Sequence, residues 1–317
     1  MNKKTITIIV ALALCFVMTI SFCVFIPSEK YTVEVAQTNE SMQRDVIRVR
    51  GVLPEVFEFG GDIEGERKIV FSYISDQPNL RRLIIKEGVI CVDELVNCPN
   101  LEYIELGKDV EDFWVGYGYP NSNYSVKEFV VHPDNTHLKV VDRCLIHKSN
   151  NAVARAPKDI DVIPEVCTQI DIGAFMNTDI ALQRDSLKNI TRIRDDAFTL
   201  CDNITSIYFP ENVAIGGSVL EGCKNLKCVY LPGSAFRDHL QSTTPFWGLS
   251  PKTTIYCGNL EDYLPQIKEW YRWTFPFAVD SVEAFMKYWG FDQNQTILFG
   301  KTADDMERDL KTTAQGR

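Results

Sequence analysis

Short runs of hydrophobic residues recur along the middle of the chain at a nearly constant spacing. Asn79-Leu80 opens one copy, and Asn100-Leu101 opens the next one 21 residues later. Asn203-Ile204 and Asn225-Leu226 open two further copies that are 22 residues apart. Within each copy, hydrophobic and polar positions alternate over a few residues, which is typical of a short β-strand. The pattern therefore predicts a series of short strands separated by turns.

A repeat unit of this length has a hydrophobic face that it cannot bury by itself. Neighbouring units must stack, so the predicted fold is a solenoid in which each coil covers the next. We expect the repeats to span residues 69–258, and residues 27–68 to form a lead-in and an N-terminal cap. The spacing is broken at residues 111–124 and 178–187, which leaves the number of coils open.

The hydrophobic spacing changes to that of helices after residue 258. Residues 260–273 and 281–289 have helical spacing, and Asp280 and Glu283 occupy N-cap and N3 positions for the second helix. Four of the five tryptophans lie between residues 247 and 289. We expect these aromatic residues to cover the last coil, since a terminal repeat needs a cover; an aromatic ligand groove is the alternative. Residues 259–317 are thus predicted to be a helical aromatic cap, with a loose polar tail from residue 301.

The N-terminal residues predict export from the cytoplasm. Lys3 and Lys4 precede residues 5–26, a stretch without charged residues that is long enough to cross a bilayer as a helix. We interpret residues 1–26 as a membrane anchor, with a cleaved signal peptide as the alternative. The expected location is the cell surface, tethered through residues 5–26, or the exterior if the segment is cleaved.

The repeats resemble those of the BspA-type leucine-rich repeat surface proteins of bacteria and protists. The similarity is clearest at residues 193–204 (IRDDAFTLCDNI) and residues 170–175 (IDIGAF). A longer unit that begins at residue 129 and carries a hairpin-like excursion is a second shared feature. The resemblance implies a leucine-rich repeat solenoid with short parallel strands and a small helical C-terminal cap. It also implies non-catalytic binding or adhesion at the cell surface, with an extracellular protein or glycan as the partner.

The outward positions of the predicted strands supply candidate binding residues. In the pattern L-x-x-I-x-L, the side chain between the last two hydrophobic residues points away from the core. Tyr208, Tyr230 and Tyr256 occupy this position, and we expect them to form an exposed strip, because tyrosine is large, rigid and amphipathic. The alternative is that the tyrosines reflect strand propensity and pack on their neighbours. With the outward residues of earlier strands, the candidates are Tyr208, Tyr230, Tyr256, Glu105, Arg82 and Lys86.

Several of the ten cysteines follow the repeat. Cys98, Cys201 and Cys223 occupy the same position of the unit. Equivalent positions of stacked coils lie about 4.8 Å apart, but their side chains point the same way, which is poor geometry for a disulfide. We therefore expect a ladder of buried thiols that behave as small hydrophobic groups, with a Cys201–Cys223 disulfide as the alternative.

Charge and motif content narrow the function. The chain has 33 Lys and Arg residues against 43 Asp and Glu residues, a net charge of −10, which argues against nucleic acid as a partner. His132, His137, His147 and His239 lack the spacing of a metal site, and no nucleophile or phosphate-binding motif is present. We expect no enzymatic activity, no cofactor and no metal site. Two other classes stay open: a structural envelope protein that self-assembles, and a sensor or enzyme accessory that uses the C-terminal segment.

Overall fold

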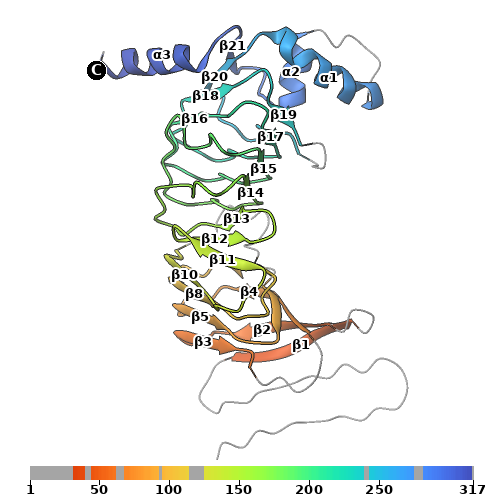
Figure 1. Ribbon diagram of the computed structural model, residues 1–317, viewed down its shortest axis with the longest axis vertical. Helices are drawn as coiled ribbons and strands as arrows, with labels where there is room; N and C mark the ends of the chain where they lie inside the picture. Colours follow the sequence, from red (N-terminus) through yellow and green to blue (C-terminus); the bar gives the residue numbers. More distant parts are fainter. Residues whose placement is uncertain are drawn as a thin grey trace, which may run out of the picture. The chain divides into compact units, whose positions relative to one another are not determined.

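A computed structural model describes residues 31–39, 44–61, 68–92, 95–113, 125–238, 243–274 and 281–315. Within it, the chain divides into two compact units, Met1–Ser149 and Asn150–Arg317 (Figure 1). The predicted anchor at residues 5–26 lies outside the described residues. Among the described helices, none is both long and apolar enough to cross a membrane.

The first unit begins with an antiparallel hairpin that leads into a parallel ladder. The hairpin strands are β1 (Tyr31–Asn39) and β2 (Arg44–Gly51). From β2 the sheet continues through β4 (Lys68–Ser75), β6 (Val89–Val92) and β9 (Asp112–Phe113), and β7 (Leu95–Val96) also pairs with β4. Val33 and Ile47 of the hairpin are buried. The hairpin thus closes one end of the ladder, the role that the sequence predicts for an N-terminal cap.

A second parallel sheet of the first unit consists of four strands in the order β10-β8-β5-β3. They are β3 (Val56–Phe59), β5 (Arg82–Ile85), β8 (Tyr103–Leu106) and β10 (Glu128–Val131). Phe57 of β3 is buried and pairs in register with Leu83 of β5, so the strand ladder begins before residue 69, earlier than expected. The antiparallel strands β11 (Leu138–Val141) and β12 (Cys144–His147) confirm the predicted hairpin excursion.

The second unit repeats one strand pattern on two sheets. The first sheet contains β13 (Ala152–Arg155), β14 (Gln169–Ile170), β15 (Arg192–Ile193), β17 (Ala214–Ile215) and β19 (Phe236–Arg237). The second contains β16 (Ser206–Tyr208), β18 (Cys228–Leu231), β20 (Thr254–Cys257) and β21 (Thr296–Leu298). All neighbouring strands in these ladders are parallel. Ile170, Ile193 and Ile215 pair in register and are fully buried, which confirms a leucine-rich repeat solenoid with short parallel strands.

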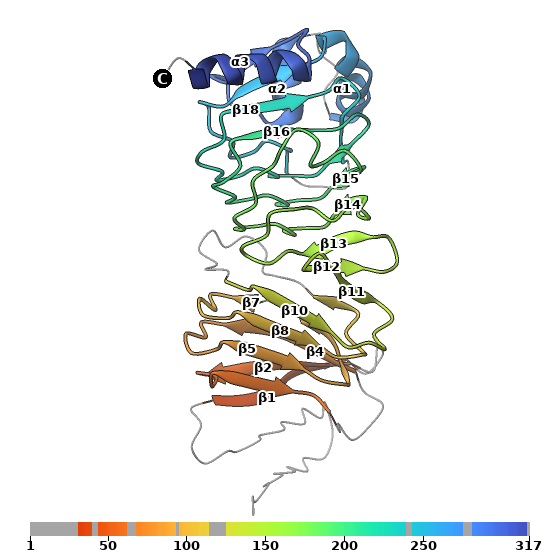
Figure 2. The ribbon, with the colours of Figure 1, turned by 60° about the vertical axis from the view of Figure 1, so that its left-hand side comes forward.

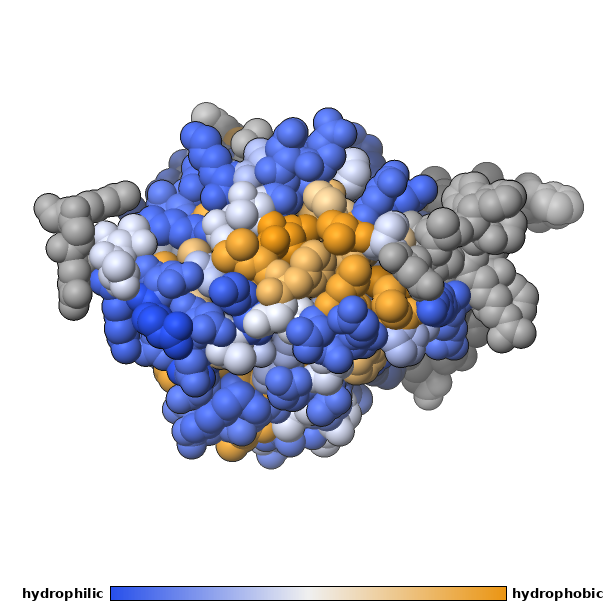
Figure 3. Space-filling model, turned by 90° about the horizontal axis from the view of Figure 1, so that it is seen from above, coloured by the Kyte–Doolittle hydropathy of each residue, from blue (hydrophilic) through white to orange (hydrophobic). Residues whose placement is uncertain are grey.

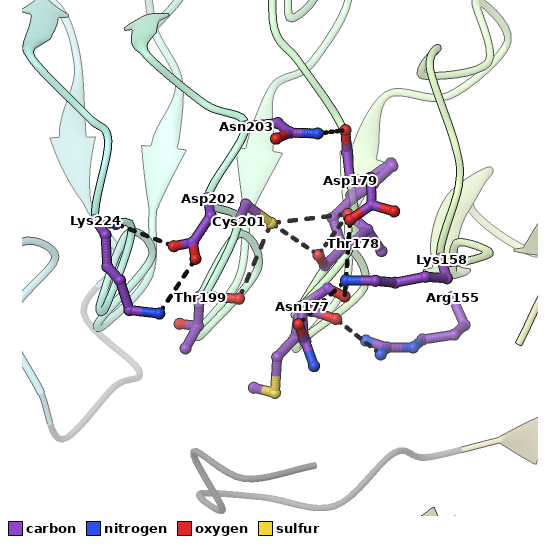
Figure 4. A network of polar contacts seen from close by, with 12 residues as sticks. Arg155, Lys158, Asn177, Thr178, Asp179, Thr199, Cys201, Asp202, Asn203 and Lys224 are labelled. Carbon is purple, nitrogen blue, oxygen red and sulfur yellow. Dashed lines mark hydrogen bonds and ion pairs between the residues drawn. The ribbon is translucent and has the colours of Figure 1, made fainter. Parts of the chain in front are cut away.

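Asparagine side chains at the start of the repeats join neighbouring coils. Asn203 Nδ2 donates a hydrogen bond to the Asp179 carbonyl over 2.8 Å, and Asn225 Nδ2 donates to the Asp202 carbonyl over 2.9 Å. Asn100 and Asn189 make the equivalent bonds in other coils. Figure 4 shows Asn203 within this network. The recurring Asn before each Leu or Ile therefore satisfies a carbonyl of the preceding coil that the strands leave unpaired.

The repeated cysteines are buried free thiols, as expected. Cys201 Sγ donates to the Phe175 carbonyl over 2.9 Å, and Cys223 Sγ donates to the Phe198 carbonyl over 3.1 Å. Burial raises the pKa of Cys98 to about 12 and that of Cys201 to about 11. Each thiol thus bonds to the backbone of the preceding coil, as its position in the repeat requires.

Helices α1 (Leu260–Thr274) and α2 (Val282–Trp289) confirm the predicted C-terminal cap. The N-cap of α2 is Ser281, whose Oγ accepts a hydrogen bond from the Ala284 amide over 3.1 Å; Asp280, the predicted N-cap, lies outside the described residues. Trp289 is fully buried, and its ring centroid lies 5.8 Å from that of Phe246. Seen from the end that carries these helices, hydrophobic side chains gather in one patch among hydrophilic ones (Figure 3). Beneath the surface, the buried Phe246 ring packs on both Trp289 of α2 and Phe209, which follows β16, so buried aromatic residues join the helices to the coils.

Candidate functional site

The three candidate tyrosines lie next to one another on the second sheet of the second unit. Tyr208 of β16 pairs in register with Tyr230 of β18, which pairs with Tyr256 of β20. The column expected from the repeat spacing is therefore present. Because these side chains share one position of the coil, they all point to the same face of the sheet.

A C-terminal helix covers this column, so the expectation of an exposed strip is wrong. The helix α3 (Ala303–Gln315) replaces the loose polar tail expected from residue 301 and lies beside β18 (Figure 2). Tyr208 is 9% exposed and Tyr256 is 5% exposed, and both pack with Cys228 and the fully buried Met306 of α3. Burial raises the pKa of the Tyr208 and Tyr230 hydroxyls. The tyrosines thus form a hydrophobic seat for α3.

Polar contacts fix α3 on this seat. The Tyr256 hydroxyl donates a hydrogen bond to Asp309 Oδ2 over 3.0 Å. Arg184 Nη1 lies 2.6 Å from both Asp304 Oδ1 and Glu307 Oε2. Arg184 belongs to residues 178–187, where the repeat spacing is broken. This irregular segment thus supplies the guanidinium group that pairs with the acidic side chains in the first turns of α3.

The other three candidates lie on the β10-β8-β5-β3 sheet of the first unit. The outward side chains of this sheet form two columns, because Val56, Arg82, Tyr103 and Glu128 are in register, as are Glu58, Ile84, Glu105 and Val130. Lys86 follows β5 and reaches the same face through Glu58, with 2.6 Å between Nζ and Oε2. We call these nine residues the open face: Val56, Glu58, Arg82, Ile84, Lys86, Tyr103, Glu105, Glu128 and Val130. The structure thus brings Arg82, Lys86 and Glu105 together on the first unit, whereas the tyrosine column belongs to the second unit.

The centre of the open face is an organised group of three side chains. The Arg82 guanidinium carbon lies 3.9 Å from the centroid of the Tyr103 ring, a cation–π distance. The Tyr103 hydroxyl donates a hydrogen bond to Glu105 Oε2 over 2.9 Å. Burial, together with this hydrogen bond, raises the pKa of Tyr103. The hydroxyl therefore stays protonated at neutral pH and can hold Glu105 in place.

Hydrophobic side chains surround this group. Val56 is 43% exposed, and Ile84 and Val130 are half-buried. Lys86 and Glu58 form an exposed ion pair at the border. The open face thus presents an arginine and a tyrosine, residue types that are enriched at protein-binding surfaces, among aliphatic and charged side chains.

The histidines considered for catalysis or metal binding make local contacts. His147 Nε2 lies 3.6 Å from Asp112 Oδ1, and His132 Nδ1 accepts a hydrogen bond from the Asp134 amide over 3.2 Å. Cys144 is fully buried on β12, and His239 lies outside the described residues. In the part of the chain that the structure describes, no group of three His, Cys, Asp or Glu side chains is arranged to hold a metal ion.

A polar pocket of about 240 Å³ lies on the first sheet of the second unit. Two ion pairs line it: Arg192 Nε with Asp238 Oδ2 over 3.0 Å, and Arg194 Nη1 with Asp171 Oδ1 over 2.7 Å. The complete lining is Asn150, Ala152, Gln169, Ile170, Asp171, Arg192, Arg194 and Asp238. No repeat position predicts this pocket. The one sign of it in the sequence is the alternation Arg192, Ile193, Arg194, which directs two arginine side chains outward at and just after the short strand β15.

The comparisons with known proteins agree with the strand ladders. A family model described as "BspA type Leucine rich repeat region" matches residues 158–239 in six copies. No curated protein matches the chain.

Three solved structures are similar to this chain. A leucine-rich repeat protein from Eubacterium ventriosum is 13% identical, covers 73% of this chain and 77% of its own, and has a TM-score of 0.40. The pneumococcal vaccine antigen PcpA is 12% identical, with 87% and 98% covered and a TM-score of 0.35. A leucine rich cell surface protein from Faecalibacterium prausnitzii is 13% identical, with 89% and 96% covered and a TM-score of 0.34. The family match and the strand ladders together show that residues 158–239 form a BspA-type leucine-rich repeat region.

Proposed function

We propose that this protein is a non-catalytic binding protein of the cell surface that attaches to another extracellular protein through the open face. The observation that carries the proposal is the group of Arg82, Tyr103 and Glu105 on an accessible sheet face bordered by Val56 and Ile84. Parallel-strand solenoids of this kind present extended sheet surfaces, and their relatives commonly use them for binding.

The arrangement of the open face supports a protein as the partner. Arginine and tyrosine dominate the binding energy of protein interfaces because each combines a large contact area with directional hydrogen bonds. Arg82 is already positioned by the Tyr103 ring, and Tyr103 by Glu105. Fewer side-chain rotamers therefore have to be fixed on binding, which favours affinity. Export is supported by the uncharged residues 5–26 that follow Lys3 and Lys4.

The experiment is a capture assay with the full chain in detergent and a mixture of surface proteins from neighbouring cells. We expect the unchanged chain to retain a partner, and a double variant, Arg82→Ala with Tyr103→Ala, to lose at least tenfold in affinity for it. That loss corresponds to about 1.4 kcal/mol, somewhat less than truncation of one binding hot spot usually costs, so it is a lower bound for the double variant.

A matched control is the double variant Arg308→Ala with Trp247→Ala. It also removes one arginine and one aromatic side chain, both highly exposed, from outside the open face. Equal binding by both double variants would reject the open face as the binding surface. Retention of only further copies of this chain would instead favour the self-assembling envelope protein.

A further inference from the structure

Small residues on the first sheet of the second unit allow two charged side chains to meet beside the polar pocket. Ala214 of β17 pairs in register with Arg192 of β15 on one side and with Phe236 of β19 on the other. Gly216, two residues after Ala214, also lacks a side chain that could fill this face. Arg192 therefore reaches across β17 to Asp238, which follows β19, and these two side chains form one border of the pocket. A methyl group on Gly216 would lie only 2.6 Å from the Asp195 amide nitrogen, so this strand approaches its neighbour too closely for a larger residue.

The charges in the pocket are balanced. Two guanidinium groups face two carboxylates, and each guanidinium is paired with one carboxylate. Asp238 is almost completely buried and its partner Arg192 is half-exposed, so this pair is a built part of the structure. The amide side chains of Asn150 and Gln169 complete the polar lining. The pocket thus offers closely spaced hydrogen-bond donors and acceptors without a net charge.

An exposed aromatic ring lies on the same sheet face as the pocket. Phe236 is 40% exposed, and it precedes Asp238 by two residues, so both side chains point to the same side of the strand. It is also two strands away from Arg192 along one in-register column. Phe236 does not line the pocket itself, but it shares this face with Asp238, which does. A flat apolar ring on the same face as a polar lining suits a ligand with one apolar face and a hydroxylated rim.

We propose that this pocket binds a single neutral saccharide unit of an extracellular glycan. Sugar hydroxyls both donate and accept hydrogen bonds, as the alternating guanidinium, carboxylate and amide groups require. Each guanidinium already has its counterion, so the pocket offers no unpaired opposite charge to a free anion or a free cation. The volume of about 240 Å³ lies below the range of drug-sized pockets, so one ring fits rather than an oligosaccharide. This inference does not rest on the open face, which belongs to the other unit.

The test uses the full chain in detergent and a panel of neutral methyl glycosides, with binding followed by saturation-transfer NMR and titration calorimetry. We expect at least one methyl glycoside to bind with a dissociation constant on the order of 1 mM, as is reasonable for so small a ligand. Phe236→Ala should weaken this binding roughly tenfold, the effect expected for losing one aromatic contact. Gln169→Ala should weaken it by a similar factor, because it removes one polar partner.

Trp247→Ala is the matched control, since Trp247 is 62% exposed and, unlike Phe236, belongs to no strand of the sheet that carries the pocket. Thermal unfolding of each variant shows whether the fold is retained. Absence of binding by every methyl glycoside overturns the proposal, as does binding that Phe236→Ala and Gln169→Ala leave unchanged. Preferential binding of inorganic phosphate or of a free amino acid over the glycosides also overturns it. Loss of protein capture in the Arg82 and Tyr103 variant with glycoside binding retained would separate this site from the open face.

Discussion

Asp196 lies in the left-handed backbone region, with φ of 55°, beside two other carboxylates. Burial, with the charges of Asp195 and Glu221, raises the pKa of Asp196 from its ordinary value of 3.8 to about 6. The folded state therefore binds this proton more tightly than the unfolded state does. The free energy of unfolding therefore falls as the pH rises from about 4 to about 6, and the full loss is present at pH 7.

Replacing Asp196 by Asn should therefore stabilise the protein at neutral pH. Asn tolerates the left-handed conformation and removes the charge. We expect a gain in unfolding free energy on the order of 1 kcal/mol at pH 7, kept small by partial solvent exposure. The gain should vanish below about pH 3, where Asp196 is protonated in both states. Calorimetric melting at several pH values checks this.

Asp134→Asn is the control for this experiment, because it removes one negative charge from a highly exposed position. A gain that is equal for both variants would show that overall charge, rather than the surroundings of Asp196, determines the effect. No gain for Asp196→Asn at pH 7 would contradict the prediction.

At the scale of elements, α3 turns the tyrosine column from an expected binding surface into a packing surface for a helix. The repeat spacing predicts that Tyr208, Tyr230 and Tyr256 stack, since stacking depends only on neighbouring coils. It does not predict that a helix from the end of the chain covers them. In α3 itself, Ala303, Met306 and Leu310 form a narrow apolar stripe at helical spacing. Thr302 is the N-cap of the helix, because its Oγ1 accepts a hydrogen bond from the Asp305 amide. That stripe was the sign in the sequence that residues 303–315 form a packed helix. The many charged residues around it favoured a loose tail instead.

Met306→Ala should release α3 without unfolding the coils. Met306 is fully buried between α3 and the tyrosines, and such truncations cost about 2–5 kcal/mol. Since α3 makes few other apolar contacts, we expect this loss to appear as faster hydrogen exchange in residues 303–315, with protection of β16, β18 and β20 largely kept. Thr312→Ala, on the exposed side of α3, is the control. Unchanged exchange in α3 after Met306→Ala would show that the ion pairs of Arg184 hold the helix by themselves.

At the scale of the whole molecule, the sequence predicts what depends on neighbouring repeats and little that depends on distant ones. The solenoid and the cysteine ladder follow from spacing, because each coil is stabilised by the next, whereas the hairpin excursion was expected from the family resemblance. The contact of Arg184 with Glu307 joins residues 123 positions apart, and the pocket combines side chains as distant in the sequence as Asn150 and Asp238. Neither the Arg184–Glu307 contact nor the pocket recurs at the repeat spacing, so the repeat pattern alone could not predict them.

The same dependence on neighbours predicts how damage spreads in the second unit. Ile193 is fully buried in the middle of a ladder, so Ile193→Ala should cost about 2–5 kcal/mol. Hydrogen exchange should then accelerate on both sides of it, in β14 and in β17, rather than in one coil only. Val162→Ala, at a side chain that is about half-exposed, should leave both strands protected. Acceleration confined to β15 would mean that the coils are stabilised independently.

The buried thiols of the repeat have a consequence for the chemistry of the protein outside a cell. Only the thiolate form attacks disulfides or is readily oxidised. With a pKa of about 11 for Cys201, roughly one thiol in ten thousand is ionised at neutral pH. Oxidation of Cys201 should therefore be slow even in an oxidising environment. The low ionised fraction of this thiol adds to the unfavourable side-chain direction in protecting the ladder from crosslinks.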